Sequence, residues 1–200
     1  MNREAYNKIA AQWDATRRCF YGLEEAYLDR LLDGLPRNSL ILDAGCGTGL
    51  PFAGRVIERG HRILGVDQSD ALLALARQRF PSQTWVLSAL EDHAFAEPCQ
   101  GVICWDTLFH IDRERHAELL GRMADCLPTG GRIMLTVGGS EQPAFTDTMF
   151  GVSFRYDSNT PEQTEHLLQG LGLRICAGEF MNLPTKGRDK GRYAILAQKS

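Results

Sequence analysis

The chain is short of the features that mark several large classes of protein. No apolar run in its 200 residues approaches the roughly 18 that a membrane-spanning helix needs, and its first residues contain no apolar signal core. The six cysteines form no Cys-x-x-Cys pair and have no zinc-like spacing. We therefore expect a cytoplasmic protein, not bound to a membrane, whose cysteines are reduced and mostly occupy core positions.

An excess of positive charge is also missing. The chain has 22 Lys and Arg against 25 Asp and Glu, which gives a formal net charge of −3. Surfaces that bind DNA or RNA usually carry a basic excess that neutralises phosphates. The composition therefore argues against nucleic acid as a partner, although it leaves room for a local basic patch. The length favours one domain over residues 1–200, and nothing in the sequence indicates an oligomeric state.

Apolar periodicity predicts alternating strands and helices. We expect helices over about residues 4–15, 24–34, 51–60, 70–79, 113–126 and 161–170, and strands near 40–44, 62–67, 84–87, 101–105, 132–137, 173–180 and 193–198. Strand, helix, strand implies a right-handed parallel crossover. The predicted fold class is therefore α/β, an open, doubly wound, mostly parallel sheet with ligands beyond the carboxyl ends of its strands.

Three smaller features complete this expectation. Ser69 is the expected N-cap of the helix over 70–79. The last two strands flank the turn-rich stretch 184–192 and are expected to form an antiparallel hairpin at one sheet edge. Residues 138–160 follow no clear pattern and are too long for an ordinary connection, so we expect an insertion on the substrate side.

The first predicted strand runs into a glycine-rich loop, Leu40–Gly49. Three apolar residues precede Asp43, as in a central parallel strand that is covered on both faces. Gly45, Gly47 and Gly49 allow a tight turn and a close approach of the backbone to a ligand. The stretch therefore predicts a cofactor loop.

The spacing of the glycines separates the nucleotide sites that such a loop can form. A dinucleotide site needs a third glycine where Leu50 stands, and the Gly-Lys-Ser/Thr ending of a phosphate-binding P-loop is absent. Asp43 would repel a pyrophosphate but would attract a cofactor with an amino group or a sulfonium. The loop therefore favours a cationic ligand.

The stretch Leu42–Gly49 resembles the first motif of the class I S-adenosylmethionine-dependent methyltransferases. Asp67 is similar to the acid that closes their second strand, Trp105–His110 to their strand-four motif, and Leu127–Arg132 to the turn before their fifth strand. The resemblance implies a small, single-domain, bacterial-type member with a Rossmann-like seven-stranded sheet and one reversed C-terminal strand. It also implies an N-terminal helical lid over residues 1–36.

The resemblance implies S-adenosylmethionine as the cofactor. Asp43 would hold its amino group directly or through water, the loop would pass under its methionine part, and Asp67 would accept the ribose hydroxyls. An alternative for Asp67 is a helix N-terminal acid, a role that Ser69 already fills. The cofactor-binding residues expected on this basis are Asp43, Gly45, Cys46, Gly47, Asp67, Gln68, Ala89, Leu90 and Trp105.

One position departs from the family pattern. Ala89 stands where many relatives carry an acid that binds the adenine amino group. The adenine could instead contact backbone groups of Ala89 and Leu90, or side chains of Glu91 or Asp92. These alternatives remain open at the level of sequence.

His110 is the best-placed catalytic candidate. An imidazole after the fourth strand could take a proton from a hydroxyl or nitrogen acceptor, and the alternative is a histidine that shapes the pocket or caps the next helix. Four other histidines fall on expected loops or helix surfaces and receive less weight: His61, His93, His116 and His166.

Missing motifs reduce the range of acceptors. The absence of an Asn/Asp-Pro-Pro-Tyr tetrad after strand four disfavours the exocyclic amines of nucleic-acid bases as acceptors. The absence of a Pro-Cys pair disfavours covalent attack on a pyrimidine ring. Cys104 lies in an apolar strand, and Asp106 has no evident acidic partner for a magnesium ion. A metal-independent in-line transfer to a small-molecule acceptor is therefore the leading hypothesis. The alternatives are an RNA or protein methyltransferase, or a non-catalytic module that binds the cofactor.

The acceptor pocket is expected under the N-terminal helices and residues 138–160. Tyr6 and Trp13 share one helical face, and both are expected at the lid. Tyr21, Arg155 and Tyr156 are further candidates for acceptor contacts. Helix-to-sheet packing is the alternative for the aromatic residues, and solvated surface charge is the alternative for the arginines.

Overall fold

Strands and helices alternate along the chain, as the sequence predicts. The computed structural model describes residues 2–186 and 189–200. The helices are α1 (Asn2–Thr16), α2 (Glu24–Leu32), α3 (Phe52–Glu58), α4 (Asp70–Arg79), α5 (His116–Asp125) and α6 (Pro161–Gly170), with short 3-10 turns at Leu108–His110 and Arg113–Arg115. The strands are β1 (Leu40–Ala44), β2 (Arg62–Asp67), β3 (Thr84–Leu87), β4 (Gly101–Cys104), β5 (Arg132–Gly138), β6 (Phe145–Met149), β7 (Val152–Tyr156), β8 (Leu173–Asn182) and β9 (Arg192–Lys199).

The main sheet has seven strands in the order β3-β2-β1-β4-β5-β9-β8. Its first five strands are parallel, and β9 runs antiparallel to both β5 and β8. The strand order reverses between β1 and β4, where open α/β sheets bind their ligands. The predicted doubly wound, Rossmann-like sheet with a reversed C-terminal strand is thus confirmed.

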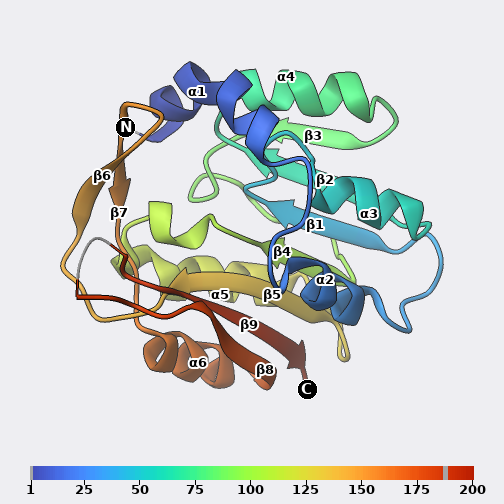
Figure 1. Ribbon diagram of the computed structural model, residues 1–200. Coiled ribbons are helices and arrows are strands. Elements are labelled where there is room, and N and C mark those ends of the chain that lie inside the picture. The colour runs from blue at the N-terminus through green and yellow to red at the C-terminus, as the bar shows by residue number, and fades with distance from the viewer. Residues whose placement is uncertain (1, 187–188) are drawn as a thin grey trace.

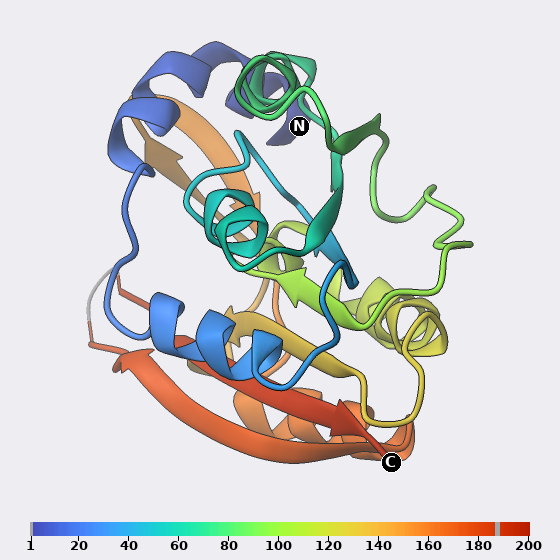
Figure 2. The same ribbon diagram turned by 90° about the vertical axis from the view of Figure 1, so that its right-hand side faces the viewer.

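Helices cover both faces of this sheet (Figures 1 and 2). On one face, α2, α3 and α4 bury residues such as Tyr27, Leu31 and Val56 against Ile41 and Ile103. The opposite face is covered by α5 and α6. Strands β1 and β4 are buried along their whole length, as continuous apolar runs predict. Helix α2 therefore belongs to the core, whereas α1 lies over the carboxyl ends of the strands.

The cysteines and the Ser69 cap follow the prediction. Cys46, Cys99, Cys104 and Cys126 are buried free thiols. The Ser69 side chain accepts a hydrogen bond from the Leu72 N–H at the start of α4.

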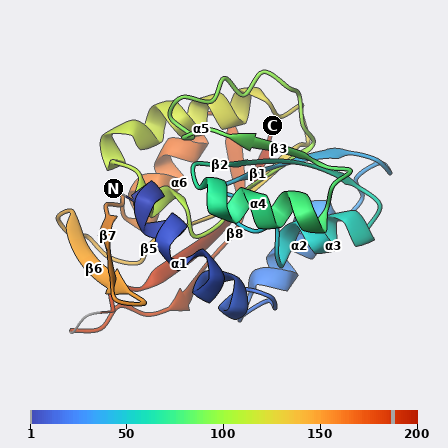
Figure 3. The same ribbon diagram turned by 90° about the horizontal axis from the view of Figure 1, so that it is seen from above.

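Residues 138–160 contain a β-hairpin that the sequence does not predict. Strands β6 and β7 pair antiparallel as a separate two-stranded sheet beside α1 (Figures 1 and 3). Phe150 and Gly151 form its turn with φ angles of 52° and 76°. Phe154 of β7 is fully buried and packs with Ala5 and Ile9 of α1. The hairpin therefore supports the N-terminal helix from the side.

Two histidines lie deeper than the sequence indicates. His61 and His116 were expected on a loop or helix surface, and both are buried. Helix α5 begins at His116, so the His116 ring can pack under the 3-10 turn that precedes it. Its Nε2 lies 3.0 Å from the Ile111 carbonyl oxygen. Within the loop 184–192, Gly187 and Arg188 lie outside the described residues. No helix in the described ranges combines the length and apolar character that crossing a membrane requires.

Candidate functional site

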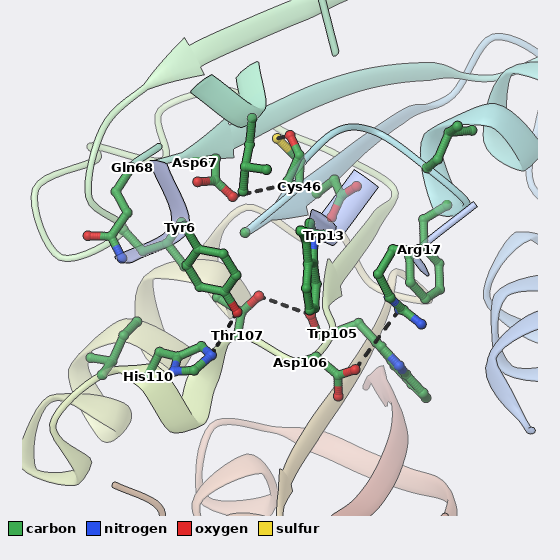
Figure 4. Close-up of a pocket in the computed structure, with 18 of the residues that line it drawn as sticks. Tyr6, Trp13, Arg17, Cys46, Asp67, Gln68, Trp105, Asp106, Thr107 and His110 are labelled. Carbon is green, nitrogen blue, oxygen red and sulfur yellow. Dashed lines mark hydrogen bonds and ion pairs between the residues drawn. The ribbon is translucent and has the colours of Figure 1, made fainter. Parts of the chain in front are cut away.

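A cavity opens beyond the carboxyl ends of β1, β2 and β4, beneath α1 (Figure 4). Tyr6, Trp13 and Arg17 line it from the lid side. Its floor is formed by residues that follow β1, β2 and β3, including Cys46, Gln68, Leu90 and Glu91. The segment after β4 closes it with Trp105, Asp106, Thr107, His110 and Ile111.

The glycine loop has little spare room. Gly45 and Cys46 donate backbone hydrogen bonds of 2.8 and 3.1 Å to the Val66 carbonyl oxygen, which holds the loop against the end of β2. Gly45 has a φ of +88°, and a Cβ there would overlap the Thr107 side chain. Glycine is therefore required at this position both by conformation and by space.

Asp67 shapes the next part of the cavity. Its carboxylate accepts hydrogen bonds of 2.8 Å from the N–H of Gly47 and of 2.8 Å from the N–H of Ser69. Burial raises the pKa of Asp67, although these N–H groups act in the opposite direction. The remaining lone pairs of the two oxygens are free to accept hydrogen bonds from a ligand.

Asp43 is a buried carboxylate without a hydrogen-bond partner among the described residues. It lines the cavity and is 3% exposed. Burial and the nearby charge of Asp67 raise its pKa to about 7. A positive group beside Asp43 would offset the cost of burying its charge. The position therefore fits the amino group of a cationic ligand.

A charged cluster joins the lid to the end of β4. The Trp105 Nε1 donates to Glu24 at 3.2 Å, and Arg17 donates two hydrogen bonds of 3.0 and 3.2 Å to the same carboxylate. Asp106 has a φ of +50° and forms a 2.6 Å ion pair with Arg192, while Arg17 lies 4.0 Å away. These contacts hold the start of the α1–α2 connection over the cavity.

His110 lies at the opposite side, between α1 and β7. Its Nε2 is 2.9 Å from the Tyr6 hydroxyl, and its Nδ1 is 3.0 Å from the Asn2 Nδ2. Burial lowers the pKa of His110 to about 4 and raises the pKa of Tyr6 well above its ordinary value. Both side chains are therefore uncharged at neutral pH.

Most residues that the sequence selects lie at this cavity. Among the nine cofactor candidates, Ala89 alone is not on its surface, whereas Glu91 is. Tyr6, Trp13 and His110 also line it. Tyr21 is 51% exposed and donates to the Thr16 carbonyl oxygen, and Arg155 pairs with Asp112, so both lie away from the cavity.

Sequence reasoning missed several apolar lining residues. Leu50, Phe52, Leu72 and Ile111 contribute to the cavity walls, and each is indistinguishable in the sequence from a core residue. In the sequence, Thr107 was recognised only as part of the strand-four motif. Its contact with Gly45 depends on how the segment after β4 folds back toward the glycine loop.

A second cavity of about 430 Å³ lies next to the first, on the far side of Asp106 and His110. Phe109, Phe145 and Tyr156 form an aromatic wall, in which Phe145 and Tyr156 stack with ring centroids 5.2 Å apart. Tyr156 also contacts the His110 ring, at 4.9 Å. Arg192 lines this cavity and pairs with Asp106 of the first one. The two spaces therefore share a wall of a few side chains.

Among the residues that the structure describes, no three His, Cys, Asp or Glu side chains gather in an arrangement that could hold a metal ion.

Comparison with known proteins agrees with the site. Residues 41–131 match the family described as the methyltransferase domain. The chain is 29% identical over 140 residues to the tRNA (carboxymethyluridine(34)-5-O)-methyltransferase of Mus musculus, covering 70% of this chain and 20% of the relative. It is 32% identical over 115 residues to the malonyl-[acyl-carrier protein] O-methyltransferase of Pectobacterium atrosepticum, covering 54% of this chain and 45% of the relative. The chain thus spans less than half the length of either relative.

A solved structure shares the whole fold. The 1,6-didemethyltoxoflavin-N1-methyltransferase of Burkholderia thailandensis, with bound 1,6-didemethyltoxoflavin and S-adenosylhomocysteine, superimposes with a TM-score of 0.71 at 19% identity, over 99% of this chain and 87% of that one. The matching domain, the relatives and the geometry around Asp43 lead to one assignment. Residues 41–131 match a methyltransferase domain, and the chain is similar to the class I S-adenosylmethionine-dependent methyltransferases.

Proposed function

We propose that the protein transfers the methyl group of S-adenosylmethionine to a small-molecule acceptor by in-line displacement, without a metal ion. The observation that carries the proposal is the buried Asp43 carboxylate, which no described residue bonds, beside a glycine loop in a cavity that α1 covers. A cofactor that is both an amine and a sulfonium fits this position better than a nucleotide with a negatively charged pyrophosphate.

The cofactor would use the two buried acids and the one arginine of the cavity. Asp43 is suited to its amino group and Asp67 to its ribose hydroxyls. Arg17 is the one Lys or Arg among the described lining residues, so it is the natural partner of the methionine carboxylate. Gln68, Leu90 and Glu91 are the remaining candidates for contacts with the adenine. Glu91 would make the contact for which the sequence analysis also considered the backbone of Ala89.

The cofactor supplies a methyl group on a positively charged sulfur. The protein's own contribution would be to position the acceptor and to keep water out, since alignment of an attacking lone pair provides much of the rate of such a displacement. Trp13 and Tyr6 of α1 cover the cavity, and Asp106, Thr107 and His110 form the wall that faces them. We assign acceptor binding to the space between these two sets of side chains.

The second cavity, behind Asp106 and His110, is another place where an acceptor could bind. Its volume of about 430 Å³ falls within the range of small-molecule sites, and its aromatic wall suits a planar or apolar molecule. Tyr156, which the sequence placed among the acceptor contacts, lies in that wall.

The names of the relatives point to more than one class of methyl acceptor. The Burkholderia enzyme is named for a small molecule, and the Pectobacterium enzyme for a malonyl group on a carrier protein. The mouse enzyme is named for a tRNA, which keeps RNA as the second candidate. The net charge of −3 favours the small molecule over RNA.

Transfer of labelled methyl groups separates the alternatives. The protein is incubated with methyl-labelled S-adenosylmethionine and, in separate reactions, with the low-mass, RNA and protein fractions of a cell extract. We expect label in the low-mass fraction alone. Label in RNA or protein would favour those acceptors, and binding of the cofactor without transfer to any fraction would indicate a non-catalytic module.

A further inference from the structure

Glu24 is a buried carboxylate that joins the connection between α1 and α2 to the wall of the first cavity. It is the first residue of α2, and its side chain is 0% exposed. Its oxygens accept hydrogen bonds of 3.0 and 3.2 Å from the Arg17 Nη1 and of 3.0 Å from the Tyr21 N–H. The Trp105 Nε1 donates a further bond of 3.2 Å. Arg17 and Tyr21 lie in the connection, whereas Trp105 follows β4, so one carboxylate holds the two parts together.

This arrangement leaves most of the Arg17 guanidinium unused. Glu24 is bonded through Nη1 alone, and no described residue accepts a hydrogen bond from Nη2 or Nε. Asp106 lies 4.0 Å from Nη2, which is too far for a hydrogen bond, and is bonded to Arg192 at 2.6 Å instead. Because the N–H groups of a guanidinium lie in one rigid plane, holding Nη1 also determines where Nη2 and Nε point.

Two aromatic rings attract the charge of Arg17 without orienting its N–H groups. The guanidinium carbon lies 5.9 Å from the Trp13 ring centroid and 5.5 Å from the Tyr21 ring centroid. Such contacts draw a positive charge toward a ring but act on the guanidinium as a whole. The direction of the free N–H groups of Arg17 therefore depends on Glu24.

Arg17 carries the only positive charge of a Lys or Arg among the described residues that line the first cavity. Figure 4 shows it on the side of Trp105 and Asp106. The same lining contains four acids, which are Asp43, Asp67, Glu91 and Asp106. An anionic group of a ligand is therefore repelled along most of the lining and attracted at Arg17.

Resting on the proposed function, we propose that Glu24 is a positioning residue that orients Arg17 toward the methionine carboxylate of the cofactor. Glu24 is not among the described residues that line the cavity, so it acts through Arg17. The carboxylate accepts hydrogen bonds from Nη2 and Nε, the parallel arrangement that guanidinium and carboxylate groups favour. Since Glu24 also bonds Tyr21 and Trp105, Arg17 keeps this orientation only while the connection lies against the wall.

The test compares two ligands that differ only in the carboxylate, S-adenosylhomocysteine and decarboxylated S-adenosylhomocysteine, by calorimetric titration. We expect the unaltered protein to bind S-adenosylhomocysteine at least about tenfold more tightly, the effect of hydrogen bonds between charged groups. Glu24→Asp keeps the charge but withdraws it by one methylene group. We expect this variant to weaken S-adenosylhomocysteine about fivefold, because Arg17 is no longer pre-oriented, and to leave the affinity for the decarboxylated ligand within about twofold.

Two further variants show whether Glu24 acts through Arg17. Arg17→Lys keeps the charge but loses the planar fork, so we expect a smaller preference for S-adenosylhomocysteine over the decarboxylated ligand. Adding Glu24→Asp to Arg17→Lys should then cause no further loss, because the two changes affect one contact. The matched control is Glu25→Asp, the same chemical change at a neighbour whose side chain is 55% exposed, and it should alter neither affinity.

Equal weakening of the two ligands in folded Glu24→Asp would assign Glu24 a structural role and overturn the proposal. An unchanged preference for S-adenosylhomocysteine in this variant would overturn it as well. Urea denaturation establishes that each variant is folded. If Glu24→Asp does not fold, Glu24→Gln takes its place. Its amide nitrogen cannot accept hydrogen bonds, so the same loss of preference is expected, and an unchanged preference overturns the proposal.

The titrations of the unaltered protein separate this inference from the proposed function. If neither ligand binds, the proposed function fails and the inference fails with it. If both ligands bind but the preference for the carboxylate does not depend on Glu24, the inference alone fails.

Discussion

Gly45 is the residue at which local conformation and the site depend most directly on each other. Its φ of +88° disfavours a side chain, and a Cβ would collide with the Thr107 side chain. We expect Gly45→Ala to lower the free energy of unfolding by about 2–4 kcal/mol, as a backbone effect and overpacking combine. Urea denaturation measures this change.

The matched control for this prediction is Gly34→Ala. Gly34 has a φ of +70°, but a methyl group added there would meet no atom within 4 Å, so only the conformational cost of about 1–2 kcal/mol applies. Equal losses in the two variants would show that the contact with Thr107 is unimportant.

We expect Asp43 to contribute to cofactor binding and to lower the free energy of unfolding of the cofactor-free protein. Its pKa is about 7 in the folded protein against 3.8 ordinarily, so the folded state binds more protons between these values. The free energy of unfolding therefore falls as pH rises through this window. We expect Asp43→Asn to be more stable than the unaltered protein, with a gain about 2 kcal/mol larger at pH 8 than at pH 5.

Urea denaturation at the two pH values checks this expectation, with the exposed Asp92→Asn as the control. The same Asp43→Asn variant should lose cofactor affinity, because the neutral amide cannot pair with an amino group's charge. A gain that does not depend on pH would contradict the account of Asp43.

Single residues were predictable from the sequence where spacing alone defines them. Asp43 lies near the end of β1, Gly47 follows β1, and Asp67 is the last residue of β2. Because these strand ends meet at the same sheet edge, the approach of the three residues follows from the topology. Ala89 is not among the residues that line the first cavity, whereas Leu90 and Glu91, which follow it, are. Asn2 contacts His110 and Arg155, which lie more than 100 residues away in the chain, so no local pattern reveals these contacts.

At the scale of elements, α1 is held over the site from two sides. Asn7 accepts a 2.5 Å bond from the Ser69 hydroxyl and donates a 2.7 Å bond to Asp70, which fastens α1 to the start of α4. We expect Asn7→Ala to speed amide hydrogen exchange in α1 and to release S-adenosylhomocysteine about three to ten times faster, since loosely fastened lids open more often.

Hydrogen exchange and stopped-flow displacement measure the two effects. Lys8→Ala, an exposed neighbour on the same helix, is the control and should change neither. Unchanged exchange and release in Asn7→Ala would mean that α1 does not act as the lid.

The elements of the main sheet were predictable, whereas the β6–β7 hairpin was not. The sheet strands are buried apolar runs that stand out in the sequence. In the hairpin, only Phe154 is fully buried, and the turn Phe150–Gly151 lacks the Asn-Gly or Asp-Gly pair that usually marks such a turn. The strands are therefore stabilised by packing on α1, which is invisible to local patterns.

At the scale of the whole molecule, the C-terminal strand lies inside the sheet. β9 pairs with β5 on one side and β8 on the other, and its residues 194–197 are buried. Because β9 lies in the same sheet as β1 and two of its buried residues pack in one cluster with those of α2, we expect a single cooperative unfolding transition over residues 1–200. Two separate transitions in calorimetry would contradict the prediction of one domain.

The same calorimetric unfolding experiment measures how much a ligand bound at the site stabilises the folded protein. With S-adenosylhomocysteine at 100 times its dissociation constant, mass action adds about 2.7 kcal/mol, which corresponds to roughly 5–10 °C in the unfolding temperature of a chain of this size.

The most direct measurement of the central claim is a calorimetric titration of S-adenosylhomocysteine into the protein and into Asp67→Asn. Asp67 holds the N–H groups of Gly47 and Ser69 and faces the cavity, so it joins the loop to the ligand. We predict one site with a dissociation constant in the micromolar range, weakened at least about tenfold in the folded variant. No binding to the unaltered protein, or equal binding to both proteins, would contradict the assignment of this cavity to the cofactor.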